Sequence, residues 1–385
     1  MRKILPAVLL LLSCTIAIGQ PKPRARALGI PFNGMPGRLN AITDVKGVTV
    51  GYKTIVRGEG TLVTGAGPVR TGVTVICPNG KSIAALPAAW YSLNGDGEMT
   101  GLPAIDDYGL NYGPIGITNT NSVGMVRDGI GQWNVKHFST GKLVDFSFGL
   151  PVAAETWDGV LNDINGFHVT TQDVFDALDS AKGGPVAEGS VGGGTGMVCY
   201  QFKGGSGTAS RVITIDSATY TIGVFVQANF GRRNELTVAG VPVGEEIADL
   251  KPEIHVPKEK DGSIIVIVVT DAPLMPLQLK QVAKRVPLGI ARTGTISHNG
   301  SGDIFLALST QAPVPANKNG SLDIWKSVPK DFMDPIYQAT VEATEEAIIN
   351  VLVAGVTTTG INGNKVYALP TDRLVQLMKK YNRGK

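Results

Sequence analysis

The sequence predicts a single mixed α/β domain, and three observations support this fold class. Stretches rich in β-branched residues alternate with stretches of helical periodicity along the chain, which is typical of such a domain. Hydrophobic residues make up 43% of the 385 residues and charged residues only 17%, so the chain can bury a large core. No segment rich in proline and serine divides the chain, although 49 glycines predict many tight turns.

The expected strands are short and rich in valine, isoleucine and threonine. They cover residues 47–52, 71–77, 197–202, 211–215, 221–228, 263–270 and 304–309. Residues 251–262 combine proline with mixed charge, so we expect an exposed loop there rather than a domain boundary.

The expected helices cover residues 173–181, 274–290, 334–353 and 371–381, where apolar residues recur at helical spacing. Asp334-Pro335 is a helix-start signal, because aspartate can cap a helix and proline suits its first turn. Pro287 is expected to kink the helix that contains it.

Residues 1–19 have the pattern of a secretory signal peptide, with a basic start, an apolar run over residues 4–12 and small residues at 17 and 19. We expect cleavage before Gln20 and export to the periplasm or the medium. The apolar run is too short for a membrane span, and no other stretch predicts one. The alternative is a lipid anchor on Cys14, although a leucine two residues before the cysteine fits that signal poorly.

The mature chain is close to neutral. The formal net charge is +3, and loss of the two basic residues of the signal lowers it to +1. Nothing in this balance favours binding to nucleic acid. Cys77 and Cys199 both lie in apolar, strand-like stretches, so we expect two buried free thiols rather than a disulfide.

The sequence shows no pattern for a metal or a nucleotide cofactor. No histidine pairs with another at metal-ligand spacing; the four are His137, His168, His255 and His298. The run Gly192–Gly196 lacks the dinucleotide fingerprint and is expected to precede a strand, not a helix. Close backbone packing or a substrate-facing loop explains it better.

Ser301 is the strongest candidate for chemistry. The loop over residues 291–303 delivers this serine to the start of the strand at 304–309, whereas the other Asn-Gly-Ser, at 319–321, continues as a polar loop. Serine needs a base before it can attack. A cut between Gly300 and Ser301 would supply one, because the freed α-amino group has a pKa of about 7.7–8.0.

Motifs spread over the mature chain resemble those of the self-cleaving N-terminal-serine aminopeptidases, which comprise the β-aminopeptidases and the L-aminopeptidase/D-amidase/D-esterase. The ordered series is more specific than any of its members. It consists of residues 40–45, 93–95, 97–101, 118–124, 158–163, 192–197, 202–205, 227–231, 270–274, 299–303 and 343–347.

The resemblance implies a four-layer αββα sandwich of the N-terminal-nucleophile type, formed by residues 20–385. It implies self-cleavage at Gly300-Ser301 into chains 20–300 and 301–385. It also implies a homo-oligomer, commonly a tetramer of such two-chain units, that needs no cofactor. Such enzymes release N-terminal residues, including D- and β-amino acids, from small peptides and amides.

The family also uses a second hydroxyl and a glutamate two residues later. Thr344 and Glu346 fit that spacing, as do Thr340 and Glu342, and we prefer the later pair. Residues two apart on a helix point about 200° away from each other, so at most one member of each pair should face the site.

Three further residues have expected roles in the site. A glutamate of this helix, with Glu342 as a candidate, would bind the substrate ammonium group. Tyr200 and Asn229, near strand ends in shared motifs, are the candidate donors to the oxyanion.

Two other classes of protein stay open. One is a serine esterase or amidase that is never cut, with His298 as the nearest base in sequence. The other is a non-catalytic exported binding protein on the same scaffold. A related acyltransferase family cuts itself at a threonine, and Ser301 argues against membership of it.

Overall fold

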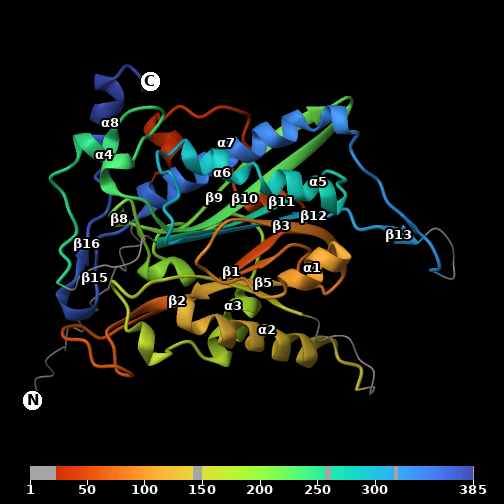
Figure 1. Cartoon of the computed structure of the whole chain (residues 1–385), viewed down its shortest axis with the longest axis horizontal. Coiled ribbons are helices and arrows are strands. Elements are labelled where there is room, and N and C mark those ends of the chain that lie inside the picture. Colours follow the sequence, from red (N-terminus) through yellow and green to blue (C-terminus); the bar gives the residue numbers. More distant parts are fainter. Residues whose placement is uncertain (1–22, 142–149, 256–261, 316–319, 385) are drawn as a thin grey trace, which may run out of the picture.

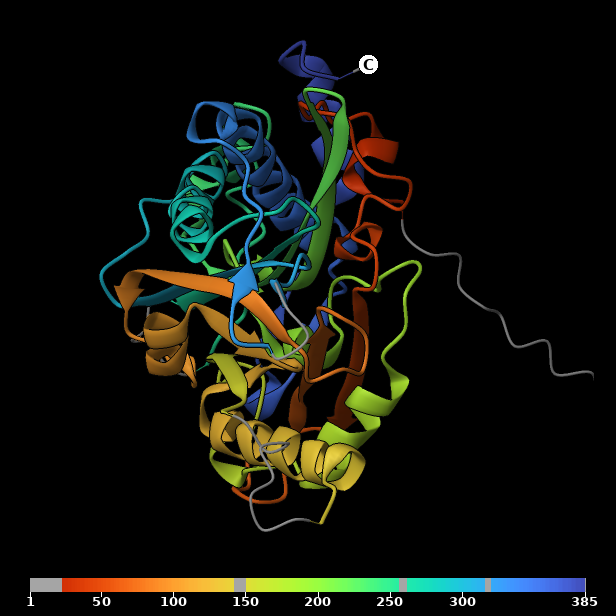
Figure 2. The same cartoon turned by 90° about the vertical axis from the view of Figure 1, so that its right-hand side faces the viewer.

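The computed structural model describes residues 23–141, 150–255, 262–315 and 320–384, which fold into four layers (Figure 1). The expected signal peptide, with Cys14 and the cut before Gln20, lies outside the described residues. Two sheets stack face to face, and helices cover the outer face of each (Figure 2). The predicted αββα sandwich is confirmed.

The larger sheet has six strands in the order β4-β3-β12-β11-β10-β9. Strands β11 and β12 run parallel to each other, and the other neighbours are antiparallel. Both central strands are buried along their whole length, as their continuous apolar sequences predict. The bounds are β3 (Ala85–Gly95), β4 (Leu110–Tyr112), β9 (Gly205–Ile215), β10 (Ala218–Phe230), β11 (Gly262–Thr270) and β12 (Ser301–Ser309).

The smaller sheet has four strands in the order β1-β2-β5-β6, of which β5 and β6 are parallel. Its bounds are β1 (Thr49–Arg57), β2 (Val69–Cys77), β5 (Ile115–Asn119) and β6 (Val152–Thr156). Three two-stranded ribbons lie outside the sheets: β7 (Val198–Cys199) with β8 (Phe202–Lys203), β13 (Val314–Pro315) with β14 (Asp323–Ile324), and β15 (Thr358–Thr359) with β16 (Lys365–Val366).

Helices α5, α6 and α7 cover the six-stranded sheet, and α2 and α3 cover the four-stranded sheet (Figure 1). Helix α1 packs beside β3, and α8 contacts α4. The bounds are α1 (Leu102–Tyr108), α2 (Val123–Phe138), α3 (Thr171–Ser180), α4 (Val243–Glu246), α5 (Pro276–Ala283), α6 (Val286–Ala291), α7 (Asp334–Ala354) and α8 (Thr371–Lys380).

Three apolar clusters fill the three spaces between the four layers. The first packs helices α5 to α7 on the six-stranded sheet and includes Phe305 and Ile348. The second joins the two sheets and includes Ile304 and Ile117. The third packs α2 and α3 on the four-stranded sheet around Trp133. Burial of this apolar surface is the main force that holds the layers together.

Most predicted elements are confirmed, and three details are wrong. Residues 197–202 form a tight hairpin rather than one strand, because Tyr200 and Gln201 adopt left-handed conformations. Residues 274–290 form two helices, and Pro287 lies in the first turn of the second rather than at a kink. Asp334 lies inside the first turn of α7, where it does not cap the helix.

The glycine run at 192–196 serves close packing between the sheets. A Cβ on Gly193 would lie 2.6 Å from the carbonyl oxygen of Ile117, and one on Gly196 would lie 2.3 Å from that of Arg70. Side chains have no room there, so this motif needs no cofactor to explain it. Cys77 and Cys199 are buried free thiols, as predicted.

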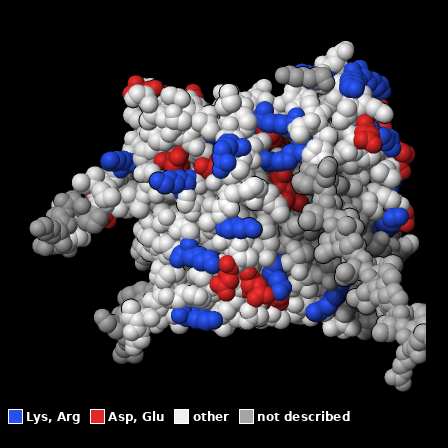
Figure 3. All heavy atoms as spheres, turned by 180° about the vertical axis from the view of Figure 1, so that it is seen from behind, with Lys and Arg blue, Asp and Glu red and all other residues white. Residues whose placement is uncertain are grey.

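The rear face of the molecule mixes acidic and basic side chains, without a wide area of one sign (Figure 3). Among the described ranges, no helix combines the length and apolarity that a membrane span requires.

Candidate active site

Two Gly-Ser junctions lie side by side at the same end of the six-stranded sheet. Strand β12 begins directly after Gly300, and β11 begins at Gly262-Ser263. The parallel ladder pairs Gly262 with Ser301 and Ser263 with Gly302. The sheet therefore brings the predicted nucleophile next to a second Gly-Ser sequence, 38 positions earlier in the chain.

Ser301 is buried and fixed by two hydrogen bonds. Its hydroxyl donates to Oδ1 of Asp303 at 2.6 Å, and its amide donates to the carbonyl of His298 at 2.9 Å. Side chains two apart on a strand share a face, which is why Ser301 and Asp303 meet. The second bond closes a turn that ends at the start of β12.

Asn94, at the end of β3, holds this arrangement from the neighbouring strand. Its amide nitrogen donates to the carbonyl of Ser297 at 2.9 Å and lies 3.3 Å from Oδ2 of Asp303. A second contact holds His298 in place: its Nε2 lies 2.5 Å from a carboxylate oxygen of Glu235. Two distant segments thus fix the turn before Ser301.

Asp303 is buried, and burial raises the pKa of its carboxyl group. Hydrogen bonds from Ser301, Ser297 and Asn94 act in the opposite direction. A carboxylate with a raised pKa binds a proton more strongly than an ordinary aspartate. The Ser301–Asp303 pair is therefore equipped to accept a proton from a reacting group.

The structure does not bring the predicted helical pairs to Ser301. The Thr344 hydroxyl donates to the carbonyl of Thr340 in its own helix, and the Thr340 hydroxyl donates to that of Ile336. Glu346 forms ion pairs with Arg26 and Arg211, each at 2.8 Å.

Glu342 belongs to the same ionic cluster, 3.6 Å from the guanidinium of Arg211. In the six-stranded sheet, Arg211 of β9 pairs with Ile222 of β10, and Ile222 pairs with Thr270 of β11. Thr270 in turn pairs with Ser309 of β12. Ser309 ends β12, about 26 Å from Ser301 at roughly 3.3 Å per residue. The cluster therefore lies near the opposite end of the sheet.

Asn229 lies beside Ser263 rather than Ser301. The two residues are direct partners in the β10–β11 ladder, so their side chains lie on the same face. The Oδ1 of Asn229 accepts from the amide of Val198, and its Nδ2 donates to the carbonyl of Trp157, both at 2.8 Å. Nδ2 carries two hydrogens, which leaves one for another acceptor.

Tyr200 is fully buried, and its hydroxyl contacts the segment that leads to Ser301. The oxygen lies 2.6 Å from the Thr293 hydroxyl and accepts from the amide of Thr295 at 3.2 Å. Burial raises its pKa well above the ordinary value, so the phenol stays protonated. The ring packs edge-on against Phe230.

Glu155, on β6, is a buried carboxylate that sequence reasoning missed. It accepts from the amide of Glu98 at 2.9 Å and from the Thr120 hydroxyl. A Cβ on Gly97 would lie 3.2 Å from this carboxylate and 3.0 Å from Cα of Gly302. The smaller sheet thus places a buried carboxyl group beside the start of β12.

Asp303, Asn94 and Ser263 were also missed. Ser301 and Asp303 also have the hydroxyl-x-acid spacing, but on a strand rather than on a helix. Asn94 lies in the motif at 93–95, but it is 207 positions from Ser301, and the sequence did not show that the two segments meet. In the part of the chain that the structure describes, no group of three metal-binding side chains occurs.

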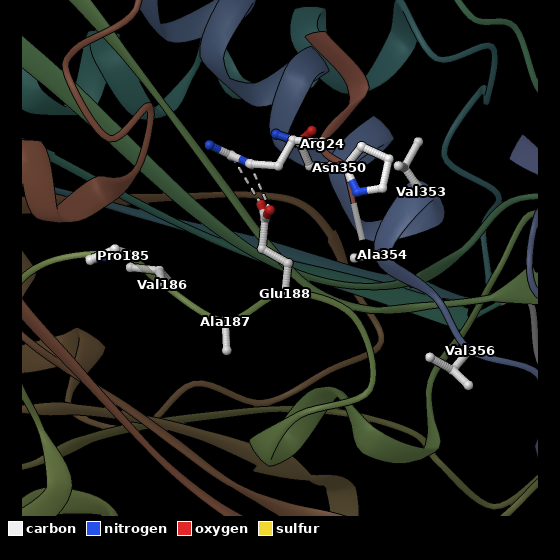
Figure 4. Close-up of a pocket in the computed structure, with 10 residues that line it drawn as sticks. Arg24, Pro185, Val186, Ala187, Glu188, Asn350, Val353, Ala354 and Val356 are labelled. Carbon is white, nitrogen blue, oxygen red and sulfur yellow. Dashed lines mark hydrogen bonds and ion pairs between the residues drawn. The ribbon is translucent and has the colours of Figure 1, made fainter. Parts of the chain in front are cut away.

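A pocket of about 400 Å³ lies away from these residues (Figure 4). It is formed by the N-terminal segment, residues 185–188 and the end of α7. The Arg24–Glu188 ion pair, at 2.7 Å, lines it. None of its lining residues belongs to the junctions described above.

The sandwich and a serine at the start of a central strand define a serine hydrolase of the N-terminal-nucleophile class, and the comparisons agree. Residues 40–366 match Peptidase family S58, to which this chain belongs. It is a serine N-terminal-nucleophile aminopeptidase by that membership.

Two curated relatives are "Beta-peptidyl aminopeptidase BapA" proteins. The one from Sphingosinicella microcystinivorans is 48% identical over 390 residues, covering 98% of this chain and 97% of the relative. The one from Sphingosinicella xenopeptidilytica is 46% identical over 388 residues, covering 98% and 95%.

Two solved structures share the fold at high similarity. The L-aminopeptidase D-Ala-esterase/amidase of Ochrobactrum anthropi, described as a variant of the Ntn hydrolase fold, is 44% identical with a TM-score of 0.88, over 94% of this chain and 100% of that one. A Burkholderia sp. β-aminopeptidase is 44% identical with a TM-score of 0.83, over 93% and 99%.

Proposed function

We propose that this protein is an exported aminopeptidase and amidase that becomes active by cutting its own chain at a Gly-Ser junction. It would release N-terminal residues, β- or D-amino acids included, from small peptides and amides. The paired junctions beside the Ser301–Asp303 hydrogen bond carry the proposal. The names of the relatives support the substrate class, because one is a β-peptidyl aminopeptidase and another is an L-aminopeptidase D-Ala-esterase/amidase.

The sequence alone favours a cut at Gly300-Ser301, whereas three structural observations favour a cut at Gly262-Ser263. The first is the backbone of Gly262. Gly262 has a φ of +98°, and a Cβ there would lie 1.9 Å from the carbonyl oxygen of Asn229. Only glycine fits that position, which directly precedes Ser263. Gly300 is not among the described glycines with positive φ.

The other two observations concern the partners of Ser301 and of Ser263. Ser301 already donates its hydroxyl to Asp303, which gives a hydroxyl and an acid at the spacing the family uses. Asn229, the candidate oxyanion donor, is the ladder partner of Ser263. We therefore assign Ser263 as the nucleophile and Ser301–Asp303 as its proton-transfer pair, with Gly300-Ser301 as the alternative cut.

In the uncut chain, the Ser263 hydroxyl attacks the Gly262 carbonyl, and its proton passes to the Ser301–Asp303 pair, whose Ser301 is the ladder partner of Gly262. The carbon–nitrogen bond breaks, the nitrogen takes a proton, and water hydrolyses the resulting ester. In the cut enzyme the α-amino group of Ser263 serves as base, with a reference pKa of about 7.7–8.0.

In turnover, Ser263 attacks the substrate carbonyl, the carbon–nitrogen bond breaks, and the amine or shortened peptide leaves with a proton, which gives an acyl-enzyme. Water then hydrolyses this ester and releases the amino acid. Asn229 donates to the developing oxyanion through its remaining amide hydrogen. Glu155 takes the role expected of Glu342, since its buried carboxylate can bind the substrate ammonium group. Recognition of that ammonium restricts cleavage to the N-terminus.

Denaturing intact mass of the purified protein tests this proposal, beside Ser263→Ala and Ser301→Ala. We expect chains 20–262 and 263–385 from the wild type and one uncut chain from Ser263→Ala. Chains 20–300 and 301–385 would show that the alternative junction is cut. An uncut wild type would leave two classes of protein open, the serine esterase or amidase that is never cut and the non-catalytic binding protein.

Export and assembly are further parts of the proposal. Residues 1–19 support export, so the amino terminus of secreted protein should begin at Gln20, unless Cys14 is lipidated. A tetramer of two-chain units is expected from the resemblance. Light scattering after gel filtration measures that mass directly.

A further inference from the structure

Lys203 is a fully buried lysine, and within the described residues its ammonium group donates to main-chain carbonyls alone. Its Nζ donates to Met197 and Gly204, each at 2.9 Å, and lies 3.4 Å from the carbonyl of Gly194. No described carboxylate lies within ion-pair distance of it. A buried cation held this way is costly, so its contacts need an explanation.

One of these carbonyls leads directly to Asn229. The Met197 carbonyl and the Val198 amide belong to the same peptide unit, and that amide donates to Oδ1 of Asn229 at 2.8 Å. On its other side, Nδ2 of Asn229 donates to the carbonyl of Trp157. Both main-chain partners fix the orientation of the amide, because a flipped Asn229 would lose both bonds.

Each hydrogen bond in this series, from Lys203 through the Met197–Val198 peptide to Asn229, polarises the next group in the same direction. An ammonium on the Met197 carbonyl withdraws electron density from that peptide, so the Val198 amide becomes a stronger donor. That donor in turn withdraws density from Oδ1 of Asn229, and the Nδ2 hydrogens become stronger donors. The Trp157 carbonyl uses one of these hydrogens, and Asn229 is the ladder partner of Ser263.

We propose that Lys203 is a positioning residue. It orients and polarises the side-chain amide of Asn229, and this amide binds the oxyanion. This inference rests on the proposed function, in which Asn229 is the oxyanion donor. Burial lowers the pKa of Lys203 to about 7, and the charge of Asp158 opposes that shift. The described contacts of the Lys203 ammonium group do not include Ser263, so we expect it to act on the rate through Asn229.

The test is a double-mutant cycle of Lys203→Met and Asn229→Ala on the cut enzyme, with β-alanine 4-nitroanilide as substrate. Active sites are counted by titration with a sulfonyl fluoride. We expect Lys203→Met to lower kcat roughly tenfold with KM unchanged, less than the ~10²–10³-fold for Asn229→Ala. In the Asn229→Ala background the same change should cost less than about twofold, since its target is gone.

Arg70→Met is the matched control, because Arg70 is also buried and also binds main-chain carbonyls, among them those of Arg57 and Gly58. It should lower stability without lowering kcat per active site. If Lys203→Met yields no soluble cut enzyme, Lys203→Gln takes its place.

Equal losses in both backgrounds, or an unchanged kcat in Lys203→Met, would overturn the inference while the aminopeptidase activity stands. An unchanged kcat in Asn229→Ala would overturn it too. A wild type that is uncut and does not hydrolyse the anilide would instead overturn the proposed function itself.

Discussion

Strand β12 and helix α7 each carry a hydroxyl residue two positions before an acid, but they present these residues differently. On β12, Ser301 and Asp303 share a face and are joined by a hydrogen bond of 2.6 Å. On α7, Thr344 binds its own helix while Glu346 binds Arg26 and Arg211. The same sequence spacing therefore brings the two side chains together on the strand and keeps them apart on the helix.

The largest expected effect tests the strand pair. Asp303→Asn should slow self-cleavage by roughly 10²–10³-fold, because the pair loses its proton acceptor. Intact mass followed over time after synthesis measures the rate. Cleavage at the wild-type rate would remove Asp303 from the mechanism.

The same pair predicts a pH dependence. Because burial raises the pKa of Asp303 above 3.8, its proton-accepting form appears only at a higher pH than for an ordinary aspartate. Cleavage should therefore speed up as pH rises through that raised pKa. Stability has the opposite sign, since the contribution of this group is lost over the same rise in pH. Asp303→Asn should abolish both trends.

The helical pair should instead affect stability. Glu346→Ala leaves the buried Arg211 without its closest carboxylate, so we expect a loss of roughly 3–5 kcal/mol in the free energy of unfolding. Urea denaturation of uncut Ser263→Ala protein measures it. Unchanged stability with lost cleavage would return Glu346 to the active site.

A matched pair of glycines tests the geometry of the strand. A Cβ on Gly302 would lie 2.5 Å from the carbonyl oxygen of Asp96, whereas one on Gly95 would meet nothing within 4 Å. Gly302→Ala should displace Ser301 and slow cleavage by about 10²-fold. Gly95→Ala, its ladder partner, should cleave normally. Equal rates in the two variants would contradict this geometry.

The smallest effect is expected at Thr344. Thr344→Val removes one hydrogen bond within the helix, so stability should change by less than about 1 kcal/mol. Cleavage and kcat should stay at wild-type values. A strong loss of either would contradict the assignment of the site to β12.

The sequence was informative where the signal was local. Runs of β-branched residues predicted β11 and β12, and the motif series implied the sandwich that the structure confirms. Helix α2 was missed, because its glycines at 124, 129 and 131 weaken the helical pattern. The sequence favours α7 for the family spacing, because this acid-rich helix offers two fitting pairs, whereas Ser301 and Asp303 fit the same spacing on a strand.

The rest of the site depends on contacts between distant segments. The register that pairs Gly262 with Ser301 arises only when two strands align in parallel. Asn94 and Glu155 reach the junctions from another strand and from another sheet. Such contacts are properties of the folded chain, and one sequence without relatives carries no local sign of them.

The most direct test of this account is the amino-terminal sequence of the smaller chain of the purified protein. We predict that it begins at Ser263 and continues Ile-Ile-Val, with Ser301 and Asp303 inside the same chain. A chain that begins at Ser301 and continues Gly-Asp-Ile would contradict the account, because Ser301 would then be the nucleophile.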